Sequence, residues 1–186
     1  MNSKASWRGA ILAILVCACS SLVLAQIPKA VQLSGVINGY TPSSVSPAGP
    51  WEVRGTWSMT INQSGIANFS AALNMDRSDY WVTLNPSDVD DPSTRSPHTH
   101  NLSLTNATVT AITGGFEISG TATLLANGGT PPFGTSVPVV IDVTGGANLK
   151  YSNVAITFQS PADGHFGTEA IGGVVQKVSK LTARHK

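Results

Sequence analysis

Residues 51–62 alternate between apolar and polar side chains, and this pattern constrains the fold more than any other feature of the chain. The apolar positions are Trp51, Val53, Trp57, Met59 and Ile61, with Gly55 in the same register. A period of two residues is typical of a β-strand with one buried and one solvated face. Residues 67–76 repeat the pattern after a short turn that contains Gly65, and the two segments together predict a β-hairpin.

Short apolar or alternating runs recur along the rest of the chain, separated by glycine, asparagine and proline. They predict further strands at residues 31–37, 80–84, 98–105, 107–113, 116–125, 137–143, 154–158 and 171–178. We therefore predict an all-β fold with about 8–10 antiparallel strands, arranged as a single β-barrel or β-sandwich. Closure into a barrel would remove exposed strand edges, but the pattern does not choose between the two.

The first 25 residues have the features of a secretory signal peptide. Lys4 and Arg8 precede an apolar stretch, and small residues lead to an expected cleavage after Ala25. The mature protein is therefore expected to be secreted or periplasmic. Both cysteines, Cys17 and Cys19, lie in this segment, so the expected mature domain has no disulfide. We predict an all-β domain over residues 26–178 and a basic, disordered tail over residues 179–186.

Charge indicates which partners to expect. The 186 residues contain 11 Lys and Arg against 10 Asp and Glu, with a formal net charge of +1. This balance gives no electrostatic reason to expect nucleic acid. We also expect no membrane association after signal cleavage. A small molecule or a metal ion is the predicted partner, and the pattern does not indicate an oligomeric state.

Three of the four histidines provide the strongest indication of chemistry. His98 and His100 are two residues apart, so a strand places both imidazoles on one face, together with Leu102 and Leu104. His165 follows in a glycine-flanked segment that we predict to be a loop. Together these imidazoles are suited to one transition-metal ion, namely zinc, copper, iron or manganese. The alternative is that His98 and His100 bind backbone carbonyl groups and no ion.

Acidic and aromatic residues supply secondary candidates. Asp90, Asp91 and Glu169 are candidates to orient a metal-bound imidazole or to carry a proton. The aspartates are also consistent with a turn before a proline, which the pattern favours, or with calcium binding, and Glu169 is consistent with a surface residue. The candidate ligand-binding aromatic residues are Tyr80, Trp81 and Phe133, whereas Trp51 and Trp57 have the parity of core residues.

The leading hypothesis is a secreted all-β domain that binds a small ligand or a metal ion through a His-x-His strand and a loop histidine. A metal-dependent enzyme with an open coordination position is the first alternative. A structural or adhesive surface module without catalysis is the second. The sequence assigns no catalytic residue and does not determine whether the protein is an enzyme.

Overall fold

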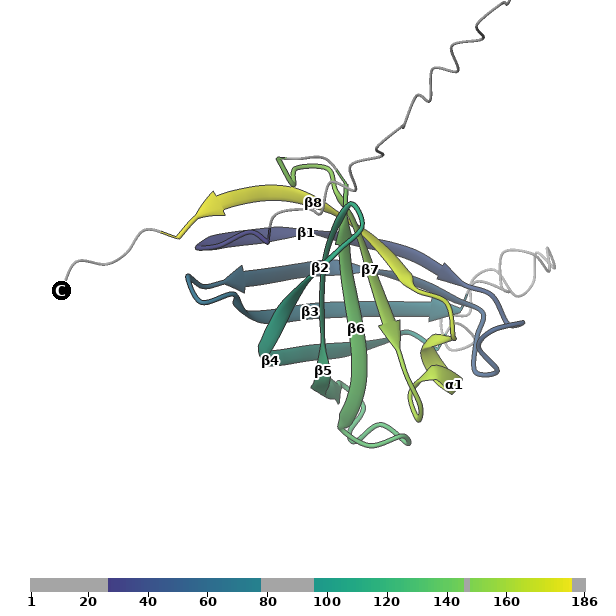
Figure 1. Ribbon diagram of the computed structural model, residues 1–186. Coiled ribbons are helices and arrows are strands. Elements are labelled where there is room, and N and C mark those ends of the chain that lie inside the picture. Colours follow the sequence, from purple (N-terminus) through teal and green to yellow (C-terminus); the bar gives the residue numbers. More distant parts are fainter. Residues whose placement is uncertain (1–26, 78–95, 146–147, 182–186) are drawn as a thin grey trace, which may run out of the picture.

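The computed structural model describes residues 27–77, 96–145 and 148–181. These residues form a closed antiparallel β-barrel (Figure 1). Its strands are β1 (Val31–Thr41), β2 (Trp51–Ile61), β3 (Ile66–Arg77), β4 (His98–Ile112), β5 (Gly115–Ala126), β6 (Ser136–Thr144), β7 (Asn153–Phe158) and β8 (Ile171–Lys180). One short helix, α1 (Asp163–Phe166), lies between β7 and β8, and no described helix is long and apolar enough to cross a membrane.

Each strand pairs with the next one along the chain, and β8 returns to pair with β1. This up-and-down order settles the choice between barrel and sandwich in favour of the barrel. Closure also leaves none of the eight strands as a sheet edge, which is the advantage that a barrel has over a sandwich.

The predicted alternation fills the barrel interior. In β2, Trp51, Val53, Trp57, Met59 and Ile61 are all buried, as their parity predicts. In β3 the buried positions are Ala67, Phe69, Ala71, Leu73 and Met75. Because the interior of an eight-stranded barrel is narrow, these side chains pack against those of the opposite strands as one core.

One strand prediction was wrong. Residues 98–105 and 107–113 were predicted as two strands, but β4 runs without a break from His98 to Ile112. Asn106 has a positive φ of 57°, and its backbone N–H donates a 2.9 Å hydrogen bond to Asn68 Oδ1. The pairing of β4 shifts register on both sides at this point, so Asn106 marks a β-bulge within one strand.

Strand ends also differ from the prediction. β1 continues to Thr41, and β8 continues to Lys180 because Lys180 pairs with Val31 across the barrel seam. Ser179 and Lys180, which were predicted in the tail, therefore belong to β8. The predicted signal peptide, the predicted strand at residues 80–84 and the end of the tail lie outside the described residues.

The directions of the strands define the two ends of the barrel. At one end β2, β4 and β6 end, and β3, β5 and β7 begin. At the opposite end β1, β3, β5 and β7 end, and β2, β4, β6 and β8 begin. Because β2 and β4 begin at this second end, it is also where Trp51 and His98 lie. We call it the loop end.

Candidate metal centre

The first two histidines come from the beginning of β4, at the loop end. Their side chains follow the inward parity predicted for Leu102 and Leu104, which are both buried. His100 is only 3% exposed, whereas His98, at the rim, is partly exposed. The strand therefore points both imidazoles towards the barrel interior.

The third histidine comes from α1. Residues 163–167 were predicted as a loop, but they form a single helical turn, in which the Phe166 N–H donates to the carbonyl oxygen of Ala162. β7 pairs with β8 only over Asn153–Ile156, and a four-residue turn, 159–162, leads from the end of β7 to α1 (Figure 1). Phe166 is fully buried and stacks on Phe158 with ring centroids 3.9 Å apart. This contact anchors the turn that carries His165.

A second contact holds α1 from the side of the β1–β2 connection. The buried hydroxyl of Ser46 donates a 2.6 Å hydrogen bond to the carbonyl oxygen of His165. Gly167 ends the turn with a φ of 91°, and its N–H donates to the carbonyl oxygen of Asp163. The backbone of His165 is thereby fixed on both sides.

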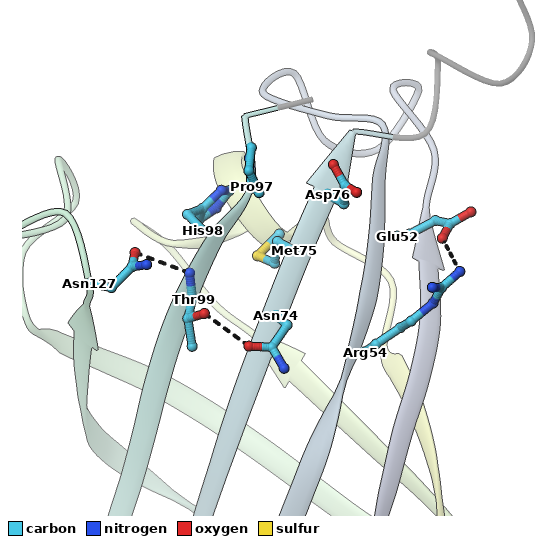
Figure 2. Close-up of a pocket in the computed structure, with 9 residues that line it drawn as sticks. All are labelled: Glu52, Arg54, Asn74, Met75, Asp76, Pro97, His98, Thr99 and Asn127. Carbon is cyan, nitrogen blue, oxygen red and sulfur yellow. Dashed lines mark hydrogen bonds and ion pairs between the residues drawn. The ribbon is translucent and has the colours of Figure 1, made fainter. Parts of the chain in front are cut away.

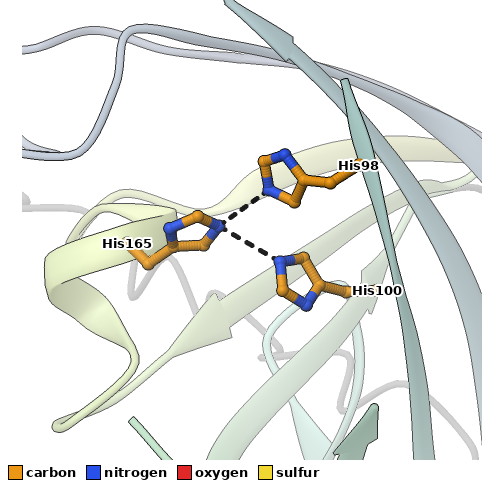
Figure 3. A group of neighbouring side chains, drawn as sticks. All are labelled: His98, His100 and His165. Carbon is orange, nitrogen blue, oxygen red and sulfur yellow. Dashed lines mark hydrogen bonds between the residues drawn. The ribbon is translucent and has the colours of Figure 1, made fainter. Parts of the chain in front are cut away.

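The three imidazoles meet at one point (Figure 3). His165 Nε2 lies 3.1 Å from His98 Nε2 and 3.2 Å from His100 Nε2. One ring nitrogen from each histidine lies within 4.8 Å of the other two. Metal–imidazole bonds of about 2.0–2.1 Å in a tetrahedral site require nitrogen atoms about 3.3 Å apart, close to the two short separations. We refer to these residues as the three-histidine cluster.

The protons of the three-histidine cluster can be assigned from its hydrogen bonds. His98 Nδ1 lies 2.7 Å from the carbonyl oxygen of Ser96, so this atom carries a proton, and in the tautomer with one N–H the lone pair lies at Nε2. His165 Nε2–H is then the donor to both His98 Nε2 and His100 Nε2. If the proton of the neutral His165 ring lies on Nδ1 instead of Nε2, three lone pairs face one another, which is the arrangement a metal ion requires.

Burial keeps two of these imidazoles neutral. The pKa of His100 is lowered to about 3, first by burial and then by the neighbouring His165 and His98. The pKa of His165 is lowered to about 4, again first by burial and then by His98. Because metal ions compete with protons for imidazole nitrogen, rings that are neutral at neutral pH are ready to act as ligands.

Aromatic rings surround the three-histidine cluster. The Trp51 ring lies 4.9 Å from that of His98 and 5.3 Å from that of His165, measured between centroids. Phe133 lies 5.5 Å from His165, and Phe166 lies 5.0 Å from His100. Phe133 was predicted to bind a ligand and lies beside the cluster. Trp51 was predicted as a core residue. The contact of Phe166 with His100 was not predicted, although the position of Phe166 next to His165 in the sequence indicated that it lies near the cluster.

A pocket of about 310 Å³ lies beside His98, between the ends of β2, β3 and β4 (Figure 2). Most of the residues that line it are of polar types, and the full set is Glu52, Arg54, Asn74, Met75, Asp76, Pro97, His98, Thr99 and Asn127. Thr99 Oγ1 donates to Asn74 Oδ1, and the Thr99 N–H donates to Asn127 Oδ1. Sequence patterns did not reveal this pocket, because it depends on which residues of neighbouring strands lie opposite one another.

The remaining predicted site residues are not part of the three-histidine cluster. Glu169 is exposed. Among the described residues, no carboxylate belongs to the three-histidine cluster. Asp90, Asp91, Tyr80 and Trp81 lie outside the described residues, so their predicted roles stay predictions.

No family model, curated protein or solved structure matches this chain. The functional argument therefore depends on the geometry and chemistry of the three-histidine cluster.

Proposed function

We propose that the protein binds one transition-metal ion through the Nε2 atoms of His98, His100 and His165. The observation that carries this proposal is the convergence of three imidazole nitrogens from two separate elements, with separations of 3.1 and 3.2 Å. Hydrogen bonds to backbone groups alone would not bring the Nε2 atoms of the three imidazoles together. The buried position of His100 supports a neutral ligand rather than a charged surface residue.

Three imidazole ligands leave at least one further coordination position on the ion, which another protein atom, water or a small ligand can occupy. Imidazole donors suit zinc, copper and iron better than manganese, which prefers carboxylate oxygen. The alternative of a metal-dependent enzyme depends on the same open position. Its predicted proton carrier among the described residues, Glu169, is exposed and stands apart from the three-histidine cluster, which favours binding over catalysis.

Elemental analysis tests the proposal directly. We expect the protein, purified without a histidine tag, to contain or take up close to one ion per chain. The His98→Ala/His100→Ala variant should lose this ion. His185→Ala is the matched control, since His185 belongs to the predicted tail, and it should leave metal content unchanged. A folded wild-type protein that takes up none of the four predicted metals would contradict the proposal.

We also propose that the chain is exported, on the basis of the basic start, the apolar run and the small residues that end at Ala25. Amino-terminal sequencing of the protein recovered outside the cytoplasm should begin at Gln26. A chain that stays in the cytoplasm with its first residues intact would overturn this proposal.

A further inference from the structure

Met75 lies directly opposite His98 in the sheet. The two residues are register partners in the antiparallel pair of β3 and β4, and both belong to the inward faces of these strands. Residues in this relation have Cβ atoms about 4.5–5.5 Å apart. Met75 is 2% exposed, so its thioether is enclosed at the same end of the barrel as the imidazoles. Figure 2 shows the two side chains together in the wall of the pocket, with the Met75 sulfur turned towards β4.

Imidazole and thioether are donors that bring no negative charge to an ion. The group formed by His98, His100 and His165 includes no carboxylate among the described residues. The aromatic rings of Trp51, Phe133 and Phe166 make the surroundings apolar. The cost of burying an ion rises with the square of its charge, so a divalent ion without an anionic ligand is disfavoured far more than a monovalent ion.

Donor softness points in the same direction as charge. A thioether is a soft donor that selects monovalent copper among the physiological transition metals, and imidazole also accepts copper well. Zinc sites in proteins use imidazole, thiolate and carboxylate donors, not thioether. A set of three imidazoles and one thioether therefore fits copper better than zinc.

We propose that this site is selective for monovalent copper, which is bound by the imidazoles of His98, His100 and His165 and by the thioether sulfur of Met75. This inference rests on the proposed function, because it names the metal and adds a fourth ligand to the same centre. No change of oxidation state is involved: the ion binds and leaves as Cu(I).

Competition titrations test both parts of the inference. Under anaerobic conditions, a chromophoric Cu(I) chelator measures the Cu(I) affinity of the full chain, and a zinc indicator measures its Zn(II) affinity. The test variant is Met75→Leu, since a Leu-for-Met exchange keeps the volume and the apolar character of the side chain. Met59→Leu is the matched control, because Met59 is also buried in the barrel but lies near Ile61, at the end of β2 remote from the loop end.

We expect the wild-type chain to bind Cu(I) more tightly than Zn(II). Met75→Leu should weaken Cu(I) binding by about tenfold or more and leave Zn(II) affinity nearly unchanged. Met59→Leu should change neither affinity. X-ray absorption of the Cu(I) form should show one sulfur neighbour of copper in the wild type and none in Met75→Leu.

Three results would overturn the inference: tighter Zn(II) than Cu(I) binding in the wild type, an equal loss of both ions in Met75→Leu, or unchanged Cu(I) affinity in that variant. In each of these cases the chain still binds a metal, so the proposed function survives. If the wild-type chain binds neither ion, the proposed function itself fails, and the two failures are therefore distinguishable.

Discussion

His100 combines deep burial with an unsatisfied ring atom. Its Nε2 faces His165 at 3.2 Å, whereas its Nδ1 is buried and has no hydrogen-bond partner among the described residues. A protonated ring here would place a charge in an apolar interior beside two other imidazoles. The residue is therefore better suited to bind an ion through one nitrogen than to stabilise the barrel.

This burial makes the stability of the metal-free protein depend on pH. The pKa values of His100 and His165 are lowered from 6.5 to about 3 and about 4 in the folded state. As the pH falls below 6.5, the unfolded chain binds protons that the folded chain does not, so the free energy of unfolding decreases down to about pH 4 and below. Urea unfolding in the presence of a chelator, compared at about pH 7 and about pH 5, should show this loss.

The His100→Asn variant provides the comparison for this prediction. It removes the most strongly shifted group, so its urea midpoint should change less with pH than that of the wild type over the same range. Equal slopes in the two proteins would show that His100 titrates normally in the folded state, against the burial argument.

At the residue scale the sequence predicted part of the site. Period-two spacing is a local property, and it placed His98 and His100 correctly on the inward face. The positions of Trp51 and Met75 relative to these histidines depend on the register of three neighbouring strands. Register is set by the whole sheet, so no local pattern could reveal that these two core residues border the three-histidine cluster.

At the scale of elements, α1 depends on the glycine that ends it. Gly167 has a φ of 91°, which is unfavourable for any other residue, and a Cβ atom there would lie 2.5 Å from Thr41 Cγ2. Gly167→Ala should lower the free energy of unfolding by about 1–3 kcal/mol and, by displacing His165, weaken metal binding. Thermal or urea unfolding together with a metal titration measures both effects.

Gly164→Ala is the matched control in the same helical turn. A Cβ atom at Gly164 would meet nothing within 4 Å, so both stability and metal affinity should stay close to those of the wild type. If Gly167→Ala also left metal affinity unchanged, the position of His165 would not depend on how this turn ends.

Two elements differed from prediction for physical reasons. The left-handed conformation of Asn106 is typical of turns. Here the backbone N–H of Asn106 donates a hydrogen bond to the side chain of Asn68 in the neighbouring strand, and β4 continues through a bulge. α1 contains four residues, too few for any helical periodicity to appear in the sequence. Its form depends on the tertiary contact between Phe166 and Phe158.

At the scale of the whole molecule, the barrel closes where β1 meets β8, and Gly35 allows the close approach of these strands. A Cβ atom at Gly35 would collide with the carbonyl oxygen of Val174 in β8. Gly35→Ala should therefore lower the free energy of unfolding by about 2–3 kcal/mol. Hydrogen exchange should be faster in β1 and β8 than in the wild type, and this is measurable by mass spectrometry.

Gly128→Ala serves as the control for the seam, since a Cβ atom there would meet nothing within 4 Å. It should leave both stability and exchange unchanged. A Gly35→Ala protein of wild-type stability would show that the seam tolerates a wider separation than the close backbone approach implies.

The sequence predicted an all-β fold but not the closure. Alternation in β2 and β3 is strong because each strand has one buried face, and either a barrel or a sandwich satisfies that requirement. Closure depends on the pairing of Val31 with Lys180, which are far apart in the chain. Long-range pairing of this kind leaves no trace in a short window of residues.

The same pairing has a practical consequence for experiments with immobilised protein. Val31 and Lys180 lie side by side at the end of the barrel remote from the loop end, because β1 leads towards the loop end and β8 leads away from it (Figure 1). An anchor attached after Lys180 would therefore hold the barrel by its far end, and the three-histidine cluster would face outwards. Protein coupled to a sensor surface in this way should expose every copy of the site in the same orientation.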